Sequence, residues 1–444
     1  MNKNIRQLVE NKRIHAAKKE LEKMQAADIA EMIDGMNDKT ALLVFRLLPK
    51  GVAAEVFSYM TREKQSELSV LVRESELEAI IGQLHFDDMI DCLEEMPANA
   101  VKRFLKNTSD VKRGLINEFL NYPDYSAGSI MTIEYVDLKA EMTIGAALEH
   151  VRQTAPDKET VYTCYVVDGS RVLKGIISLK DLVLANPVSS VEDVMKTNFI
   201  SVNIGSDREE VAGIFKKYDL LAVPVTDREN RLVGIITIDD IVDVIDDENT
   251  EDFHRMAAIQ PSDERYLAAS VFDLARRRIL WLLVLMVSAT ISGSIIRRYE
   301  DMLHTMVILA SFIPMLMDTG GNAGSQSSTL IIRSIALGEI RLKDTPKVLW
   351  KEIRVSIIVG LVLGTVNFLR ILYIERADMV VSVTVSVTLV ITIVSAKLVG
   401  GFLPLIAKKL RIDPAIMASP VITTTVDAVS LITYFSVAAV IIGL

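Results

Sequence analysis

At 444 residues the chain is too long for one ordinary domain, and two or three are expected. Its mean hydropathy is positive, +0.31, although 24% of its residues are charged, which indicates separate soluble and membrane parts. Residues 1–275 hold 48 acidic against 32 basic side chains, whereas residues 276–444 hold 10 against 17. So acidic a soluble part excludes nucleic acid as a partner and favours cations.

Residues 1–125 are predicted to form short amphipathic helices. Apolar residues recur there at helical spacing in 41–49, 52–60, 77–84 and 87–97. Prolines and a glycine separate these segments. We therefore expect a small superhelical domain that serves as a scaffold or an interaction surface.

An internal repeat follows the turn-rich segment 122–128. Each copy is predicted to run strand, turn, strand and helix start, and three residues recur at one offset of 59 positions. The recurring pairs are Asp168 with Asp227, Gly175 with Gly234, and Asp181 with Asp240. The repeat resembles a tandem pair of cystathionine-β-synthase (CBS) modules, here 126–187 and 188–246. Such α/β pairs are regulatory ligand-binding units.

A charged, largely helical connector over 247–275 leads to five apolar stretches. Each is long enough to cross a hydrocarbon core, which needs about 20 residues. The stretches are 279–296, 302–337, 355–373, 379–406 and 415–444. With the N-terminus inside, the inner flanks carry eleven Lys and Arg residues and the outer flanks four. This excess, and an N-terminus without a signal-peptide pattern, predict a cytosolic N-terminal half.

Ionisable residues inside the spans are the sharpest functional clue, because each costs about 3 kcal/mol at mid-bilayer unless paired or hydrated. The main candidates are Asp318, Arg333, Lys397 and Asp427. Asp427 shares a helix face with Thr423, Thr424, Pro420 and Ser430. A threonine-rich stripe favours a hydrated ion pathway. The alternative is that Asp427 forms an ion pair with Lys397 or Arg333 that holds the helices together.

The second span is predicted to be broken at 317–327, where glycines are dense. Non-helical backbone at membrane depth lines a cavity or is packed by protein. Oxygen-bearing side chains at Asn322, Ser325, Gln326 and Thr329 favour cavity lining. The alternative is close helix packing through small residues.

The ligands on offer indicate a hard cation. Cys92 and Cys164 lie far apart, the five histidines are scattered, and no phosphate-binding loop pattern occurs. Mg²⁺ loses its water reluctantly, so one carboxylate per subunit with supporting hydroxyls suits a largely hydrated ion. A membrane potential of 100 mV supplies about 4.6 kcal/mol per divalent ion, so no energy-coupling module is required.

Three motifs carry a specific resemblance that covers the whole chain in order. They are YPDYSAGSIMT at 122–132, PMLMDTGGNAGSQSSTLIIR at 314–333 and DPAIMASPVITTTVDAVSLITY at 413–434. With the CBS pair between them, these look like the MgtE family of bacterial Mg²⁺ channel-transporters. The resemblance implies a mainly α homodimer with a pore on its axis. Its parts would be an N domain (1–125), two CBS modules (126–187 and 188–246), a plug helix (247–275) and five spans (276–444).

The resemblance also assigns site residues. The family's pore aspartate falls on Asp427, and a pore asparagine of the family motif is Ser325 here. The implied pore-lining residues are Gly321, Asn322, Ser325, Thr329, Thr423 and Thr424. The implied regulatory Mg²⁺ ligands are Glu55, Asp87, Asp91, Asp207, Glu209, Asp219, Asp240, Asp243, Glu248, Glu251, Asp252 and Asp413. Asp87 and Asp91 also stand four apart on one helix face, a pair that repels unless a cation bridges it.

We expect a transporter rather than an enzyme, since no nucleophile–base pair or catalytic metal spacing occurs. Mg²⁺ would be both the transported and the regulatory ion, and its binding would compact the cytosolic dimer and close the pore. One alternative is transport of Co²⁺ or other divalent ions. Another is a membrane-tethered sensor whose CBS modules bind an adenine nucleotide through Ser178 and Asp181 or Thr237 and Asp240.

Overall fold

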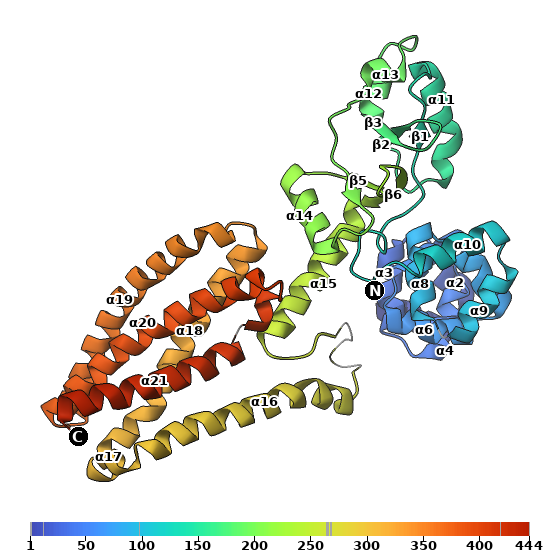
Figure 1. Ribbon diagram of the computed structural model, residues 1–444. Helices are drawn as coiled ribbons and strands as arrows, with labels where there is room; N and C mark the ends of the chain where they lie inside the picture. Colours follow the sequence, from blue (N-terminus) through green and yellow to red (C-terminus); the bar gives the residue numbers. More distant parts are fainter. Residues whose placement is uncertain are drawn as a thin grey trace. The chain divides into compact units, whose positions relative to one another are not determined.

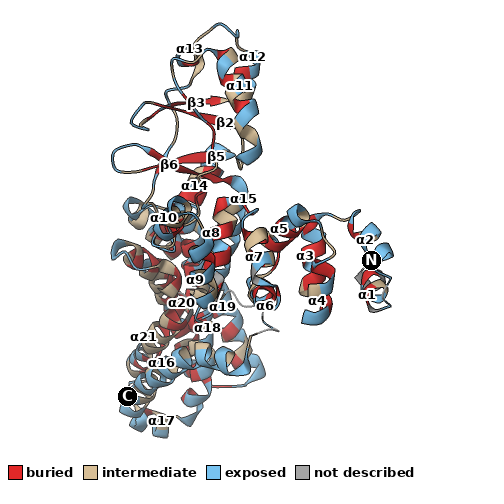
Figure 2. Cartoon of the chain, turned by 90° about the vertical axis from the view of Figure 1, so that its right-hand side faces the viewer, coloured by how far each residue is buried: buried red, intermediate tan, exposed pale blue. Residues whose placement is uncertain are grey.

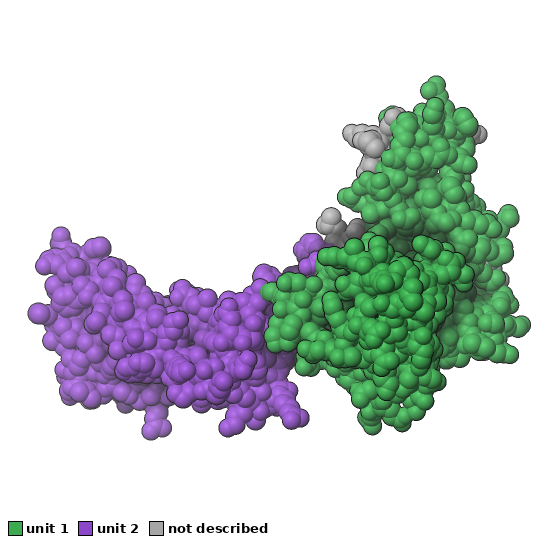
Figure 3. Space-filling view, turned by 90° about the horizontal axis from the view of Figure 1, so that it is seen from above, with its two compact units in different colours: residues 1–245 green, residues 246–444 purple. Residues whose placement is uncertain are grey.

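The computed structural model describes residues 2–11, 13–96, 98–262, 266, 269–417 and 419–443. The chain divides into two compact units, Met1–Ile245 and Asp246–Leu444 (Figure 3). Each unit has its own buried apolar core.

Short helices fill the first part of the first unit, as predicted (Figure 1). Their apolar faces are buried against one another (Figure 2). Ile29, Ile33, Val56 and Phe57 are fully shielded from solvent. Each helix is short because a capping residue or a turn ends the apolar period after two to three turns. The helices are α1 Asn2–Glu10, α2 Ile14–Leu21, α3 Ala26–Asp34, α4 Asp38–Phe45, α5 Lys50–Ser58, α6 Arg62–Leu71, α7 Glu74–Ile81, α8 Phe86–Glu95, α9 Ala98–Asn107 and α10 Asp110–Phe119.

Two three-stranded sheets with the same topology follow. In each, the first strand pairs parallel with the second and the second pairs antiparallel with the third. The first sheet holds β1 Asp137–Leu138, β2 Thr163–Val167 and β3 Leu173–Ser178, and the second holds β4 Val202–Asn203, β5 Ala222–Thr226 and β6 Leu232–Thr237. The helices beside them are α11 Ile144–Thr154, α12 Leu179–Leu184, α13 Val191–Val194, α14 Arg208–Tyr218 and α15 Ile238–Met256. The predicted order of strand, turn, strand and helix is confirmed in both copies.

The repeated glycine has a packing reason in each sheet. A Cβ on Gly175 would lie 2.8 Å from the sulfur of Met195, and a Cβ on Gly234 would lie 2.8 Å from the sulfur of Met131. Each glycine sits at the same register position of its hairpin. A methionine thus covers the strand where a side chain would otherwise stand, which explains why the glycine recurs at the offset of 59.

Helix α15 continues from the second sheet across the predicted boundary at residue 246 without a break and ends at Met256. The next helix, α16 (Val271–Arg298), begins within the predicted connector 247–275. Residues 263–265 and 267–268 of this connector lie outside the described residues.

The second unit is helical. Beyond α16 it holds α17 Glu300–Thr305, α18 Ile313–Ala336, α19 Thr345–Leu369, α20 Met379–Lys409 and α21 Ser419–Ile442. Among the described residues, four helices are long and apolar enough to cross a membrane: α16, α19 with its flanking turns, α20 and α21. Helix α18 is more polar but packs along α20 and α21. Helix α16 contacts α21 and buries none of its own side chains (Figure 2).

The predicted break in the second span is wrong. Helix α18 runs through 317–327 as one continuous helix. Its glycines face α20 and α21, so the alternative of close packing through small residues describes this face. The cost of glycine in a helix, about 1 kcal/mol per residue, is offset where the missing side chain lets another backbone approach.

Candidate ion pathway and cation sites

Glycines bring α18 into backbone contact with its neighbours. A Cβ on Gly324 would lie 2.8 Å from Ile422 Cγ2 of α21, and a Cβ on Gly400 of α20 would collide with the carbonyl group of Gly324. At Gly320 a Cβ would lie 2.9 Å from Ser430 Oγ. The three helices therefore form a tightly packed core, against which the other faces of α18 are held in fixed positions.

The exposed face of α18 is polar. Asp318, Asn322, Gln326 and Thr329 are exposed and recur at intervals of three or four residues, so they form one stripe along the helix. Of the other two predicted pore-lining residues on this helix, Ser325 is half-buried, and Gly321 is buried with Thr423 of α21 at van der Waals distance. A polar stripe at membrane depth is unfavourable against lipid.

Asp427 is half-buried on α21, and the carboxylate of Asp318 is near enough to interact with it electrostatically. Within the described part of the chain, Asp427 forms no ion pair with Lys397 or Arg333, so the ion-pair alternative is not what the structure has. One turn from Asp427, the hydroxyl of Ser430 is buried without a hydrogen-bond partner. Two carboxylates from different helices thus interact with each other, and the unsatisfied hydroxyl of Ser430 lies one turn from one of them.

Threonines follow Pro420 on α21. The hydroxyls of Thr423 and Thr424 donate to the Pro420 carbonyl at 3.1 and 2.9 Å, which leaves their oxygen lone pairs free to accept from water. Thr424 also lines a cleft of about 140 Å³ against Trp281 of α16. The two predicted pore-lining threonines therefore face different neighbours, Thr423 toward α18 and Thr424 toward α16.

A separate buried network engages Lys397. Its ammonium donates to Ser327 Oγ at 3.4 Å, and Ser327 donates to the carboxylate of Glu352 on α19 at 2.5 Å. All three side chains are nearly shielded from solvent. Glu352 was not predicted, although α19 carries a visible signal: its buried residues, including Glu352, Ser356, Gly360 and Gly364, recur every four positions.

In the first unit, the structure brings Asp87 and Asp91 of α8 together with Asp240 at the start of α15. Burial, followed by the charge of Asp240, raises the pKa of Asp87. Burial, followed by repulsion from Asp239 and Asp91, raises the pKa of Asp240 to about 7, against a lowering hydrogen bond from Thr237. Burial also raises the pKa of the neighbouring Asp88 to about 6. Carboxylates under such mutual repulsion are suited to a shared cation.

The remaining predicted ligands of the first unit are exposed. Glu55 lies on α5, Asp207 caps the start of α14 and accepts from the Glu209 amide at 2.8 Å, and Asp219 ends α14 in a left-handed conformation. Asp243 follows Asp240 by three residues on α15. Asp207 and Asp219 therefore lie at opposite ends of one helix.

The predicted ligands of the second unit lie close together, around the side chain of an arginine. Arg255 of α15 forms ion pairs with Glu251 and with Asp413, which precedes α21. Burial, followed by the charges of Asp413 and Glu248, raises the pKa of Asp252 to about 6. Arg255 was not predicted, because its partner Asp413 lies 158 residues away in sequence.

The residues proposed to bind a nucleotide lie where the last strand of each sheet leads into the next helix. Ser178 donates to Asp181 at 2.7 Å and Thr237 donates to Asp240 at 2.6 Å. Asp181 is also 3.4 Å from Lys196. The two pairs occupy equivalent positions, but only the second belongs to the acidic cluster around Asp87.

Residues 313–437 match the MgtE family, described as a divalent cation transporter. Residues 24–125 match the MgtE intracellular N domain, and residues 127–187 and 191–247 match the CBS domain. The chain is 36% identical to the magnesium transporter MgtE of Thermus thermophilus, over 95% of this chain and 94% of that protein. It is 32% identical to the magnesium transporter MgtE of Bacillus subtilis, over 93% of each.

Two solved structures resemble the N-terminal part. The cytosolic domain of the Mg²⁺ channel MgtE in complex with ATP aligns with 55% of this chain and all of that one, at 34% identity and a TM-score of 0.53. The soluble part of a magnesium transporter aligns with 56% of this chain and 97% of that one, at 30% identity and a TM-score of 0.52.

Proposed function

Because the chain belongs to the MgtE family of divalent cation transporters, we propose a route for the ion through its membrane helices and a gate in its cytosolic part. The protein transports Mg²⁺ and is a multi-pass membrane protein with its N-terminal half in the cytosol. We assign the route to polar side chains of α18 and α21, and the gate to carboxylates of the cytosolic part and of the chain that joins it to the spans.

The observation that carries the route is a pair of membrane carboxylates for which the described residues provide no ion-pair partner. Asp427 and Asp318 belong to different helices and interact electrostatically, while the basic residue Lys397 is engaged by Ser327. Two unneutralised carboxylates at membrane depth are costly unless water or a cation reaches them. A hydrated Mg²⁺ supplies two positive charges and a shell of donor water to both.

We assign the narrow part of the route to a homodimer. The polar stripe of α18, which includes Asn322, Gln326 and Thr329, is exposed in a single chain. A second copy related by a two-fold axis would cover such a stripe and bring a second Asp427 to the axis. The path is then lined by backbone and hydroxyl oxygens that accept hydrogen bonds from the water around the ion. These oxygens belong to Gly321, Ser325, Thr423 and Thr424. The driving force is the membrane potential.

The gate is proposed to be closed by Mg²⁺ at the cytosolic acidic residues. At low internal Mg²⁺ the carboxylates of Asp87, Asp91 and Asp240 repel one another, and a bound cation would neutralise them. A decisive closure takes about 5.5 kcal/mol of differential binding, so several weak sites must act together. The further proposed ligands are the exposed carboxylates of the first unit and an acidic group in the second. The first are Glu55, Asp207, Glu209, Asp219 and Asp243, and the second are Glu248, Glu251, Asp252 and Asp413.

Uptake into liposomes tests the route. Purified Asp427→Ala should take up Mg²⁺ at the background rate of protein-free vesicles, because the carboxylate that holds the hydrated ion is gone, and Asp427→Glu should retain part of the activity. Glu339→Gln, which changes an exposed carboxylate beyond the end of α18, is the matched control. Uptake by Asp427→Ala at the wild-type rate would remove Asp427 from the route.

Two alternatives bear on specificity and on the CBS pair. Co²⁺ remains open as a substrate, since the family is described by divalent cations in general, and competition with Mg²⁺ uptake separates the two. A purely sensory role fits less well, because the relatives named as magnesium transporters match more than nine-tenths of the chain. A solved MgtE cytosolic domain holds ATP, which favours an adenine nucleotide beside Ser178 and Asp181 or Thr237 and Asp240 as a modulator.

A further inference from the structure

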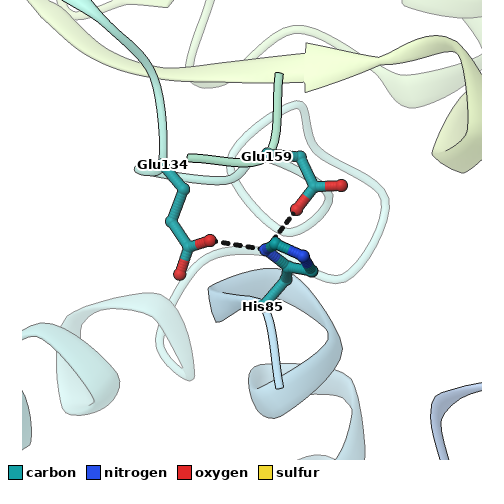
Figure 4. A group of neighbouring side chains, drawn as sticks. All are labelled: His85, Glu134 and Glu159. Atoms are coloured by element: carbon teal, nitrogen blue, oxygen red, sulfur yellow. Dashed lines mark hydrogen bonds and ion pairs between the residues drawn. The ribbon is translucent and has the colours of Figure 1, made fainter. Parts of the chain in front are cut away.

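A histidine and two glutamates, none of them predicted from the sequence as a ligand, converge in the first unit (Figure 4). His85 directly precedes α8, Glu134 precedes β1, and Glu159 precedes β2. The imidazole Nδ1 lies 2.6 Å from Glu134 Oε2 and 2.7 Å from Glu159 Oε2. One ligand atom from each residue lies within 4.8 Å of the other two.

The backbone holds the two glutamates in place before any ligand binds. The amide of Glu159 donates to the carbonyl of Glu134 at 2.9 Å. Two residues before Glu134, Thr132 exchanges backbone hydrogen bonds with Ile235 of β6 at 2.8 and 2.9 Å. The carboxylates therefore stand on anchored chain segments rather than on free loops, which lowers the entropic cost of gathering them around an ion.

The imidazole does not satisfy both carboxylates. Its Nδ1 can donate one proton, which serves Glu134, and Glu159 Oε2 is shielded from solvent without a hydrogen-bond partner. Asp87 Oδ1, two residues along from His85, is likewise shielded and unpartnered, and Asp87 interacts electrostatically with Glu159. Among the described residues, no Lys or Arg forms an ion pair with Glu134, Glu159 or Asp87. The cluster therefore leaves two buried carboxylate oxygens, Glu159 Oε2 and Asp87 Oδ1, without a hydrogen-bond donor.

We propose that His85, Glu134 and Glu159 bind a transition-metal dication such as Zn²⁺ or Co²⁺, which joins the start of α8 to the two CBS loops. Imidazole with carboxylates suits such metals, whereas Mg²⁺ prefers oxygen ligands alone. Ligand atoms around Zn²⁺ stand about 2.0–2.2 Å from the metal and so roughly 3.4 Å apart. Each glutamate oxygen would move about 0.7 Å farther from the imidazole Nδ1 than it is now, which side-chain rotation can supply. Asp87 Oδ1 is the nearest candidate for a further ligand or for accepting from a bound water.

None of the three proposed ligands belongs to the proposed route of Mg²⁺ through the membrane, so the site is tested by binding and not by uptake. Zn²⁺ is titrated calorimetrically into the full-length protein in detergent with millimolar Mg²⁺ present to occupy the oxygen-only sites, and Co²⁺ is followed by its visible absorption. We expect a site for about one ion per chain that survives Mg²⁺. His85→Gln and Glu159→Gln should each weaken it by more than about 100-fold, since even outer-shell partners of a metal ligand contribute about 10- to 100-fold.

His15→Gln is the matched control, an exposed histidine on α2 of the same unit, and should bind as the wild type does. His85→Lys keeps a cation between the two glutamates but removes the imidazole, so it should preserve the fold and lose the Zn²⁺ site. The proposal would be overturned if the wild type showed no Zn²⁺ binding in the presence of Mg²⁺. It would also be overturned if His85→Gln and His85→Lys bound Zn²⁺ as tightly as the wild type, and the cluster would then be an ion pair only. Either result leaves the proposed route of Mg²⁺ untouched.

Discussion

Asp318 of α18 and Asp427 of α21 differ in their exposure to solvent. Asp427 is half-buried, while Asp318 belongs to the exposed polar stripe of α18. In the proposed dimer that stripe meets water or the second copy, so Asp318 acts on the ion through space rather than as its principal ligand. In a water-like environment, a single negative charge and a divalent cation about 8 Å apart interact by about 1 kcal/mol.

Asp318→Asn should therefore lower Mg²⁺ uptake by liposomes about fivefold, far less than loss of Asp427, because one such charge interaction disappears. Initial uptake rates at subsaturating Mg²⁺ measure the effect, with Glu339→Gln, an exposed carboxylate outside the stripe, as the control. A wild-type rate in Asp318→Asn would mean that this carboxylate does not face the ion.

From the sequence alone, the functional residues that could be predicted were mainly charged residues placed where charge is unfavourable. Asp427 stands out because a carboxylate in an apolar span has few ordinary explanations. Asp87 and Asp91 stand out by their spacing on one helix. Arg255 and Glu159 could not be found in this way, because their importance lies in partners distant in the chain: Asp413 for the first and His85 for the second.

Helix packing in the second unit depends on positions without side chains. Helices α18, α20 and α21 approach through Gly320, Gly324 and Gly400, and a side chain at any of these would meet another helix at less than normal contact distance. The local glycine count predicted a broken helix, because propensity alone makes each glycine unfavourable. Tertiary contacts with α20 and α21 keep the helix continuous, and the sequence of the span alone does not reveal those contacts. The β-hairpins of the CBS pair were predictable because the repeat displays the same pattern twice.

Gly400→Ala should destabilise the membrane unit, because its methyl group would collide with the Gly324 carbonyl. Overpacking of this kind costs about 1–3 kcal/mol and should lower the melting temperature in detergent. Gly293→Ala on α16 is the matched control, since a Cβ there meets nothing within 4 Å and alanine is the better helix former. Equal melting temperatures for the two variants would show that α18 and α20 are not packed through this glycine.

At the scale of the whole molecule, charge is divided between an acidic soluble part and a basic membrane part. The acidic part keeps several carboxyl groups close together, and their pKa values are raised, to about 6 for Asp88 and about 7 for Asp240. A raised carboxyl pKa means that folding is favoured while the group is protonated. The stability from these groups is present below about pH 4 and is lost as the pH rises through 6 and 7.

The metal-free protein should therefore melt at a lower temperature at pH 8 than at pH 5, by roughly 5 °C. His85 acts in the same direction, since its hydrogen bond to Glu134 and the adjacent carboxylate of Glu159 raise its pKa to about 11, and its contribution declines above about pH 6.5. Added Mg²⁺ should restore stability at pH 8, and Asp240→Asn should flatten the pH profile. Glu141→Gln, an exposed carboxylate, should leave the profile unchanged. Stability that rises from pH 5 to 8 without metal would contradict the repulsion described.

Transport and its feedback meet in one central claim: the membrane helices conduct Mg²⁺, and internal Mg²⁺ stops them. Both parts are tested by Mg²⁺ influx into proteoliposomes with an inside-negative potential, measured with the internal Mg²⁺ set either to micromolar or to millimolar levels. We predict rapid influx at low internal Mg²⁺ and influx at least about tenfold slower at high internal Mg²⁺. The combined variant Asp240→Ala with Glu251→Ala should remain open at both. No influx at either level, or wild-type influx that ignores internal Mg²⁺, would contradict the claim.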